Sequence, residues 1–173
     1  GALWIWNPGK NKIHTAAAVL SLAEAVCSWL VILNCMGMKL PLWSIGPGLE
    51  LCLRLDGTGA LFSGLASLIW VLVVFFAFEY MEHEKEDARF FGCLIMSLGA
   101  LTGVAWAGNF VTLYLFFEMM TFFSVPLVFH SRKREALRAG MVYLAYSMLG
   151  ASIALGGYFF FRQYACGTDF KAG

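Results

Sequence analysis

The feature that most constrains this chain is an apolar run from residue 90 to residue 129 with one charged side chain in it, Glu118. A helix needs about 20 apolar residues to cross a bilayer, so this run is about twice as long as one span. Gly108-Asn109 supplies turn chemistry within the run, and we expect a tight reversal of the chain there. The sequence therefore predicts two consecutive membrane spans, at 90–108 and 109–129.

Three further stretches are long and apolar enough to be membrane spans, at 14–36, 57–79 and 139–161. The composition agrees, because 60% of the residues are hydrophobic and 13% are charged, whereas soluble domains have about a quarter of their residues charged. So few charges do not cover a surface that faces water on all sides. The predicted fold class is an all-α integral membrane protein with about five transmembrane helices in a lipid bilayer.

The segments between the spans differ in character. Residues 37–56 contain Gly46-Pro47-Gly48 and an alternating pattern from Glu50 to Leu55, which predicts a short hairpin or another extended surface element. Residues 80–89 and 130–138 are charged loops, and the second is strongly basic. The remaining segments are the two ends: 1–13, which resembles the tail of an absent apolar helix followed by a loop, and 162–173, a polar tail.

The orientation in the membrane follows from the positions of lysine and arginine, which are enriched in cytoplasmic loops. More of them lie on the side of the 80–89 and 130–138 loops than on the side of the 37–56 element. We therefore expect the hairpin to face outward and the basic loops to face the cytoplasm of a bacterial or archaeal cell. The net charge of +1 indicates no nucleic-acid partner. The side of the two charged loops carries Lys10, Lys12, Lys85, Arg89, Arg132, Lys133, Arg134 and Arg138. The side of the 37–56 element carries Lys39, Arg54, Arg162 and Lys171.

Two carboxyl groups fall in the middle of predicted spans, Glu118 in 109–129 and Glu24 in 14–36. An ionised carboxylate at the centre of a bilayer costs several kcal/mol, so such groups face the protein interior and commonly serve transport. For Glu118 we expect proton or ion transfer, and the alternative is a neutral acid that hydrogen-bonds between helices. Glu24 lies among Ala, Ser and Cys, which favours a role in helix packing, with proton transfer as the alternative.

Glu118 has no evident cationic partner, because no Lys or Arg falls in the core of a predicted span. His130 is twelve residues further on, or about 18 Å along a helix, so only a chain of water could link the two groups. We expect a second subunit or another part of the chain to supply the counter-charge. Pro126 removes one helical amide and favours a kink, although membrane helices also tolerate proline without one. Asp56 is interpreted as the N-cap of the span that follows it.

Motifs for cofactors are absent from the sequence. It contains no G-x-G-x-x-G, Walker loop or H-E-x-x-H, and its five cysteines form no C-x-x-C pair. We interpret the cysteines as small buried side chains. The sequence predicts no cofactor, no metal site and no redox catalytic residue.

Four short motifs resemble a known family. They are Asp56-Gly-Thr-Gly-Ala-Leu-Phe, Arg89-Phe-Phe, Gly108-Asn-Phe and Leu115-Phe-Phe-Glu-Met-Met. In this order they resemble the N-terminal half of the antiporter-like, proton-channel subunits of respiratory complex I, of Mrp Na+/H+ antiporters and of membrane-bound hydrogenases. The resemblance implies that the five spans match the second to sixth helices. It also implies that Glu118 pairs with a lysine on a later, broken helix and relays protons through buried water. Phe117 replaces a tryptophan that is usual in the family.

The sequence leaves three functions open. The first is a proton-translocating subunit of an NADH:quinone oxidoreductase-like complex, in which electron transfer elsewhere changes the field on Glu118. The second is a subunit of an Mrp-type cation/proton antiporter or a membrane-bound hydrogenase. The third is a structural membrane subunit that moves no ion. The expected partners are other membrane subunits, protons and, in the second case, Na+.

Overall fold

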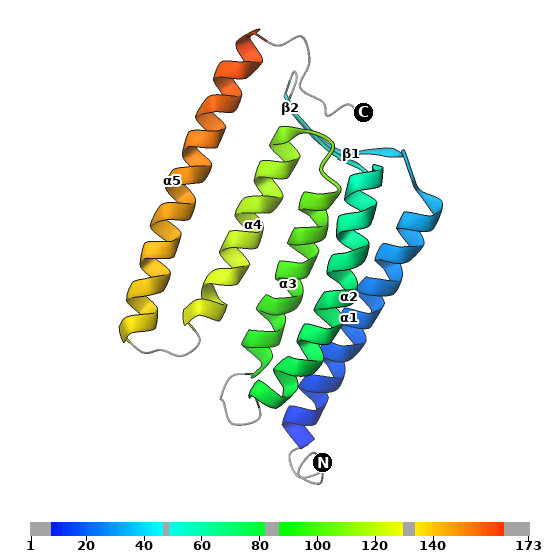
Figure 1. Cartoon of the computed structure of the whole chain (residues 1–173), viewed down its shortest axis with the longest axis vertical. Coiled ribbons are helices and arrows are strands. Elements are labelled where there is room, and N and C mark those ends of the chain that lie inside the picture. Colours follow the sequence, from blue (N-terminus) through cyan, green and yellow to red (C-terminus); the bar gives the residue numbers. More distant parts are fainter. Residues whose placement is uncertain (1–7, 47–48, 82–86, 130–133, 165–173) are drawn as a thin grey trace.

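The computed structural model describes residues 8–46, 49–81, 87–129 and 134–164. They form five helices and a two-stranded hairpin (Figure 1). All five helices are long and apolar enough to cross a membrane, which confirms the predicted fold class of an integral membrane protein. The elements are α1 (Pro8–Asn34), β1 (Lys39–Gly46), β2 (Leu49–Arg54), α2 (Gly57–Tyr80), α3 (Asp87–Ala105), α4 (Phe110–Val128) and α5 (Arg134–Tyr164).

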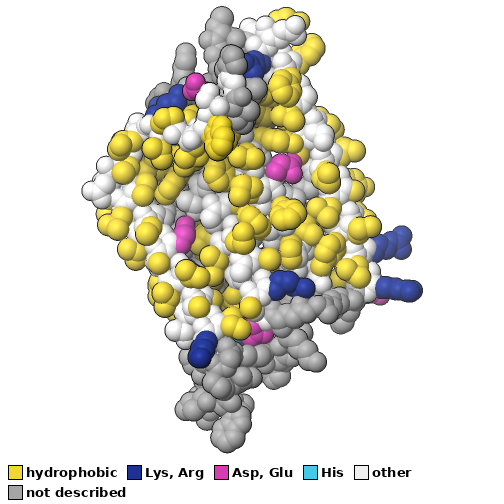
Figure 2. Space-filling model, turned by 180° about the vertical axis from the view of Figure 1, so that it is seen from behind, with side chains coloured by type: hydrophobic (Ala, Val, Ile, Leu, Met, Phe, Trp, Pro, Cys, Tyr) yellow, Lys and Arg dark blue, Asp and Glu magenta, His cyan; other side chains and the backbone are white. Residues whose placement is uncertain are grey.

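The helices stand side by side, with α5 outermost next to α4 (Figure 1). The hydrophobic core lies among α1, α2 and α3, where Val74, Met81 and Phe91 are almost completely buried. α4 packs mainly against α3. Apolar side chains also cover much of the outer surface (Figure 2). A surface of this kind is expected where lipid is the solvent.

Several helices extend further than the apolar runs predict. α1 begins at Pro8 rather than at residue 14, since proline fits the first turn of a helix, where its missing amide costs nothing. α5 runs from Arg134 to Tyr164 rather than over 139–161, so part of the predicted basic loop is helical. Its 31 residues span about 46 Å, more than the hydrocarbon thickness of about 30 Å. The charged first turn of α5 therefore fits outside the apolar layer.

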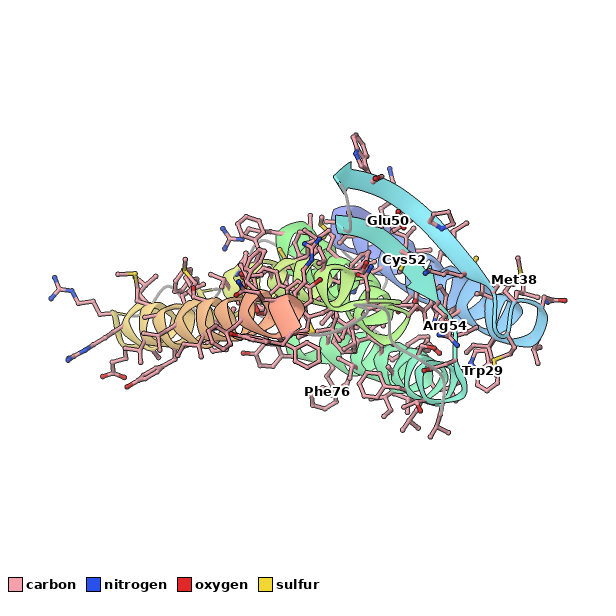
Figure 3. The ribbon with its side chains drawn as sticks, turned by 90° about the horizontal axis from the view of Figure 1, so that it is seen from above. Trp29, Met38, Glu50, Cys52, Arg54 and Phe76 are labelled. Carbon is pink, nitrogen blue, oxygen red and sulfur yellow. The ribbon has the colours of Figure 1, made fainter. Side chains whose placement is uncertain are left out.

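The hairpin lies at the end of the bundle away from the start of α1, and β2 is seen beside the helix ends in Figure 3. Its strands pair antiparallel, with Pro41 opposite Cys52. β2 also holds the reversal between α3 and α4, because the Arg54 amide donates to the Trp106 carbonyl at 2.7 Å and the Gly108 amide donates to the Cys52 carbonyl at 2.9 Å. The predicted hairpin and the predicted reversal are thus both present and in contact.

Gly108 allows this close approach of the reversal to β2. A Cβ atom at this position would lie 2.8 Å from the Cys52 sulfur, closer than packed atoms tolerate. Cys52 is buried, as expected for the cysteines. That expectation is wrong for Cys27, which is exposed on the outer face of α1.

Asp56 caps α2, as the sequence predicts. Its backbone is extended, and its carboxylate accepts a hydrogen bond from the Gly59 amide at 2.6 Å. A side-chain oxygen at this place satisfies one of the free amides of the first turn and stabilises the helix by about 1 kcal/mol. The cap also fixes where the chain leaves the hairpin and enters the bundle.

Candidate functional site: Glu118 and the interface between α4 and α5

The start of α4 is fixed by a buried network around Asn109. The Asn109 Oδ1 atom accepts from the Thr112 amide at 2.9 Å and from the Thr112 hydroxyl at 2.8 Å. The Asn109 amino group donates to the Glu50 carbonyl at 2.6 Å and to the Cys52 sulfur at 3.3 Å, and the Cys52 amide donates to the Thr112 hydroxyl at 2.9 Å. The helix that carries Glu118 is therefore tied to the hairpin by its own N-cap.

Glu118 lies midway along α4 and is half-buried. Its carboxyl group makes no hydrogen bond or ion pair with the residues that the structure describes. Thr121, one turn further on and 4% exposed, lies on the same side of the helix. Glu118 thus lies one turn from a buried threonine in a helix that has no other charged side chain.

α4 and α5 meet through polar side chains on this side of α4. The hydroxyl oxygens of Thr121 and Ser147 are 3.4 Å apart, and those of Ser124 and Tyr143 are 3.3 Å apart. The two helices run in opposite directions (Figure 1). Because Ser147 lies level with Thr121, Glu118 lies about one turn further along α5, toward its C-terminal end. Thr121 and Ser124 thus form a polar contact between α4 and α5, and Glu118 lies one turn before Thr121 on α4.

The counter-charge for Glu118 does not come from the described helices. Their basic residues lie within the first turns of a helix or near its last turn, and the rest are in the hairpin. His130, the other candidate partner, lies outside the described residues. Pro126 is inside α4, but only two residues before its end. The basic residues whose side chains the structure describes are Lys12, Lys39, Arg54, Arg89, Arg134, Arg138 and Arg162.

Glu24 occupies a different interface from Glu118. Its Oε1 atom accepts a hydrogen bond from the Thr102 hydroxyl of α3 at 3.0 Å. Its Oε2 atom is buried and has no hydrogen-bond partner in the described part of the chain. Glu24 therefore joins α1 to α3, an arrangement that fits helix packing and also leaves one carboxyl oxygen available.

The sequence interpretation missed a pair of buried ionisable groups, His14 of α1 and Asp87 of α3. Their side chains approach to 3.3 Å and are almost completely buried. In the sequence, His14 is the first residue of the predicted span at 14–36, and Asp87 lies in the predicted charged loop at 80–89. The signal that could have found His14 is its spacing to Ala17 and Ser21, which puts all three on one helix face.

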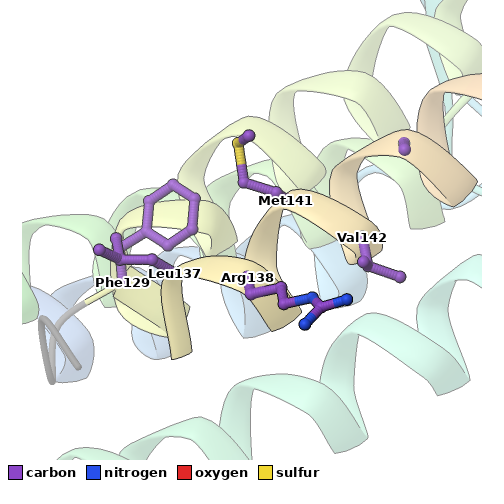
Figure 4. Close-up of a pocket in the computed structure, with 6 residues that line it drawn as sticks. Phe129, Leu137, Arg138, Met141 and Val142 are labelled. Atoms are coloured by element: carbon purple, nitrogen blue, oxygen red, sulfur yellow. The ribbon is translucent and has the colours of Figure 1, made fainter. Parts of the chain in front are cut away.

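An apolar pocket lies between the end of α4 and the beginning of α5 (Figure 4). Phe129, Leu137, Met141 and Val142 line it, and Arg138 contributes the one charged group among its lining residues. Its walls offer little to bind an ion. The pocket lies near the helix ends, whereas Glu118 lies midway along α4.

Comparisons with known proteins give relatives at the level of sequence and of fold. Residues 44–91 match the family model described as NADH-ubiquinone oxidoreductase (complex I), chain 5 N-terminus. The Na+/H+ antiporter subunit A1 of Staphylococcus aureus is 35% identical over 155 residues, which are 85% of this chain and 19% of that protein. The chain therefore spans about a fifth of the length of this relative.

Two solved structures share the fold. One is a chain of the Mrp complex from a Dietzia species, with a TM-score of 0.76 and 18% identity over 92% of this chain and 31% of that one. The other is a chain of an archaeal membrane-bound sulfane sulfur reductase, a respiratory membrane complex, with a TM-score of 0.73 and 21% identity over 90% of this chain and 32% of that one. Both similarities extend over all or nearly all of the helical bundle.

Proposed function

Because this chain belongs to the family of antiporter-like membrane subunits that includes those of Mrp antiporters and complex I, we propose that it forms part of a proton path in a multi-subunit membrane complex. Glu118 is the group that carries the proton. The observation behind this proposal is a half-buried carboxyl group midway along an apolar helix, without a partner among the described residues. Ionisable groups placed in this way are costly and typically mark ion pathways.

The chemistry asked of Glu118 is reversible proton binding. A cation brought close to a carboxyl group favours its ionised form. The approach of a cation therefore releases the proton to water, and withdrawal of the cation lets Glu118 take up another. The Thr121 hydroxyl, one turn along α4 from Glu118, lies 3.4 Å from the Ser147 hydroxyl, and hydroxyl groups of this kind hydrogen-bond water, which supports a water path here. In the family that this chain resembles, the cation is a lysine on a later helix.

Cation/proton exchange is the form of coupling that the relatives favour. The protein with 35% identity is named a Na+/H+ antiporter subunit, and the Mrp complex shares the fold. The second candidate is redox-driven proton translocation, favoured by the family model named after complex I and by the similar fold in a respiratory complex. In both, other membrane subunits complete the path, and this chain supplies Glu118 rather than a redox cofactor.

Replacement of Glu118 by glutamine tests the proposal, since glutamine keeps the hydrogen-bonding capacity but does not ionise. The complete complex is assayed in everted membrane vesicles, where a pH-sensitive dye reports Na+-dependent proton movement. A blue-native gel reports assembly. We expect Glu118→Gln to assemble and to lose the dye response. The matched control is Glu79→Gln, an exposed glutamate at the end of α2, which should keep the response.

The other outcomes separate the alternatives. An assembled Glu118→Gln complex with a normal response would contradict the proposal and leave Glu118 a structural residue. A response that needs an electron donor rather than Na+ would identify the redox-driven form. Glu24→Gln belongs in the same series, and a normal response there would support the interpretation that Glu24 serves helix packing.

A further inference from the structure

The pocket between the end of α4 and the beginning of α5 combines an apolar wall with one cation (Figure 4). Its volume is about 640 Å³, within the range of about 300–1,000 Å³ that is usual for small-molecule sites. Phe129, at the end of α4, forms one side. The other side follows one face of α5, because its residues recur at helical spacing. They are Leu137, Arg138, Met141, Val142 and Ala145.

Gly140 gives this pocket its shape. A Cβ atom at this position would overlap the Phe129 ring, so the glycine lets that ring lie directly against α5. Gly140 is buried by this contact, whereas Leu137 and Met141 on the pocket wall are 41% and 66% exposed. The pocket is therefore anchored by packing between the two helices, and its apolar wall is open on the outer side of the bundle.

The position of Arg138 along α5 places it at the depth of the lipid headgroups. The length of α5, about 46 Å, exceeds the hydrocarbon thickness by about 16 Å, so a centred helix extends about 8 Å beyond the apolar layer at each end. Arg138 is four residues after the first residue of α5, or about 6 Å along the axis. Met141 and Val142 lie about 4–6 Å deeper. The pocket thus crosses the boundary between headgroups and acyl chains.

The charges at this end of α5 are mainly positive. Arg138 is exposed and makes no ion pair with the residues that the structure describes. Arg134 lies one turn before it, and Glu135 is the one acid of these first turns. In the sequence, Arg132 and Lys133 come directly before α5. Basic pockets between helices on the cytoplasmic side, the side that we expect here, attract anionic lipid headgroups.

We propose that this pocket binds an anionic phospholipid of the surrounding bilayer. The Arg138 guanidinium holds the phosphate, because its planar fork of donors matches two phosphate oxygens. The first part of an acyl chain lies against Leu137, Met141 and the Phe129 ring. An apolar protein surface over the pocket would bury Arg138 without a counter-charge, which is costly. One phospholipid supplies both the anion and the apolar chain.

The bound lipid contacts α4 and α5 together. It therefore adds to the two polar contacts between these helices, Thr121 with Ser147 and Ser124 with Tyr143. The site lies at the helix ends, whereas Glu118 lies midway along α4. This inference is thus independent of the proposed proton path.

Photo-crosslinking in the complete complex identifies what covers the pocket. Met141 is replaced by the photoreactive residue p-benzoyl-phenylalanine, and the complex is placed in nanodiscs of equal parts phosphatidylglycerol and phosphatidylcholine. Mass spectrometry after digestion identifies the adducts at this position. We expect phospholipid adducts with an excess of phosphatidylglycerol. If this variant does not assemble, Val142, which also lines the pocket and is exposed, carries the photoreactive group instead.

Arg138→Gln, added to the crosslinking variant, removes the cation of the pocket. We expect the ratio of phosphatidylglycerol to phosphatidylcholine adducts to fall about fivefold, the effect of one arginine at an anionic membrane surface. The matched control is Arg134→Gln, which removes the same charge one turn away from a residue that does not line the pocket.

The control should change the ratio less than about twofold, because its charge is screened by water and salt. Equal adducts of the two lipids in the parent complex would overturn the proposal, and so would equal losses in the two arginine variants. An adduct with a protein chain in place of lipid would show that another part of the complex covers the pocket, and would also overturn it.

Discussion

The hydrogen bonds of Asn109 predict how firmly α4, the helix that carries Glu118, is anchored. Replacement by alanine removes the oxygen that accepts from the Thr112 amide and hydroxyl, and also the amino group that donates to the Glu50 carbonyl. Replacement by serine keeps a good N-cap oxygen but lacks the donor. The two variants therefore separate the cap of α4 from its tie to the hairpin.

The expected magnitudes follow from these bonds. Loss of the bond to Glu50 costs about 1 kcal/mol of the free energy of unfolding. Loss of the cap costs about 1 kcal/mol more, and the buried Thr112 amide is left without its acceptor. Asn109→Ser should therefore cost about 1 kcal/mol and Asn109→Ala about 2–3 kcal/mol. The control is Asn34→Ala at the exposed end of α1, which should cost less than about 0.5 kcal/mol.

The measurement is equilibrium unfolding in mixed micelles with increasing denaturing detergent, followed by tryptophan fluorescence. Each variant is compared with the parent protein for its free energy of unfolding. Equal costs for serine and alanine would show that the cap oxygen contributes nothing. A cost below about 0.5 kcal/mol for alanine would refute the argument that this network anchors α4.

Two further predictions concern helix packing and capping. A Cβ atom at Gly103 would overlap the Phe116 ring of α4, so Gly103→Ala should destabilise the protein by about 1–3 kcal/mol. Gly99 has open space around it, so Gly99→Ala should be neutral or stabilising by up to about 1 kcal/mol. Unfolding in the same mixed micelles compares the two variants. Asp56→Ala should cost about 1 kcal/mol by removing the α2 cap, while Asp56→Asn should cost much less. Equal unfolding energies within either pair would contradict the packing or the capping argument.

Local chemistry in the sequence was enough to predict the main elements of the fold. Apolar runs indicate the five helices, because the bilayer imposes a minimum span length. Gly108-Asn109 indicates the reversal, since one residue permits close approach and the other caps the next helix. The hairpin follows from turn residues and alternation. Helix ends are less predictable, because the charged turns that begin at Pro8 and Arg134 leave the apolar layer without ending the helix.

The candidate site was only partly predictable for a different reason. Glu118 stands out because it is the one charge in a long apolar run. His14 and Asp87 do not stand out, because each sits beside charged flanking residues and becomes significant only when α1 and α3 are placed side by side. The contact between Glu24 and Thr102 has the same origin. Long-range pairing of helices is information that the pattern along one helix does not contain.

The polar residues of this bundle differ in how they satisfy their hydrogen bonds. The buried hydroxyls of Ser63, Ser67 and Thr121, for example, donate to carbonyls of their own helix. Such residues cost little in an apolar interior and let helices approach closely. A carboxylate cannot do this, because it has no proton to donate to a backbone carbonyl.

The carboxyl groups within the bundle therefore depend on groups outside their own helix, unlike Asp56, which caps α2. Glu24 uses a hydroxyl of α3, Asp87 meets His14, and Glu118 meets no partner among the described residues. Of these three carboxyl groups, Glu118 is the one whose state the described part of the chain leaves open to an external cation. The same property that makes a carboxyl group in an apolar helix costly makes it responsive to nearby charge, and the proposed proton transfer depends on this property.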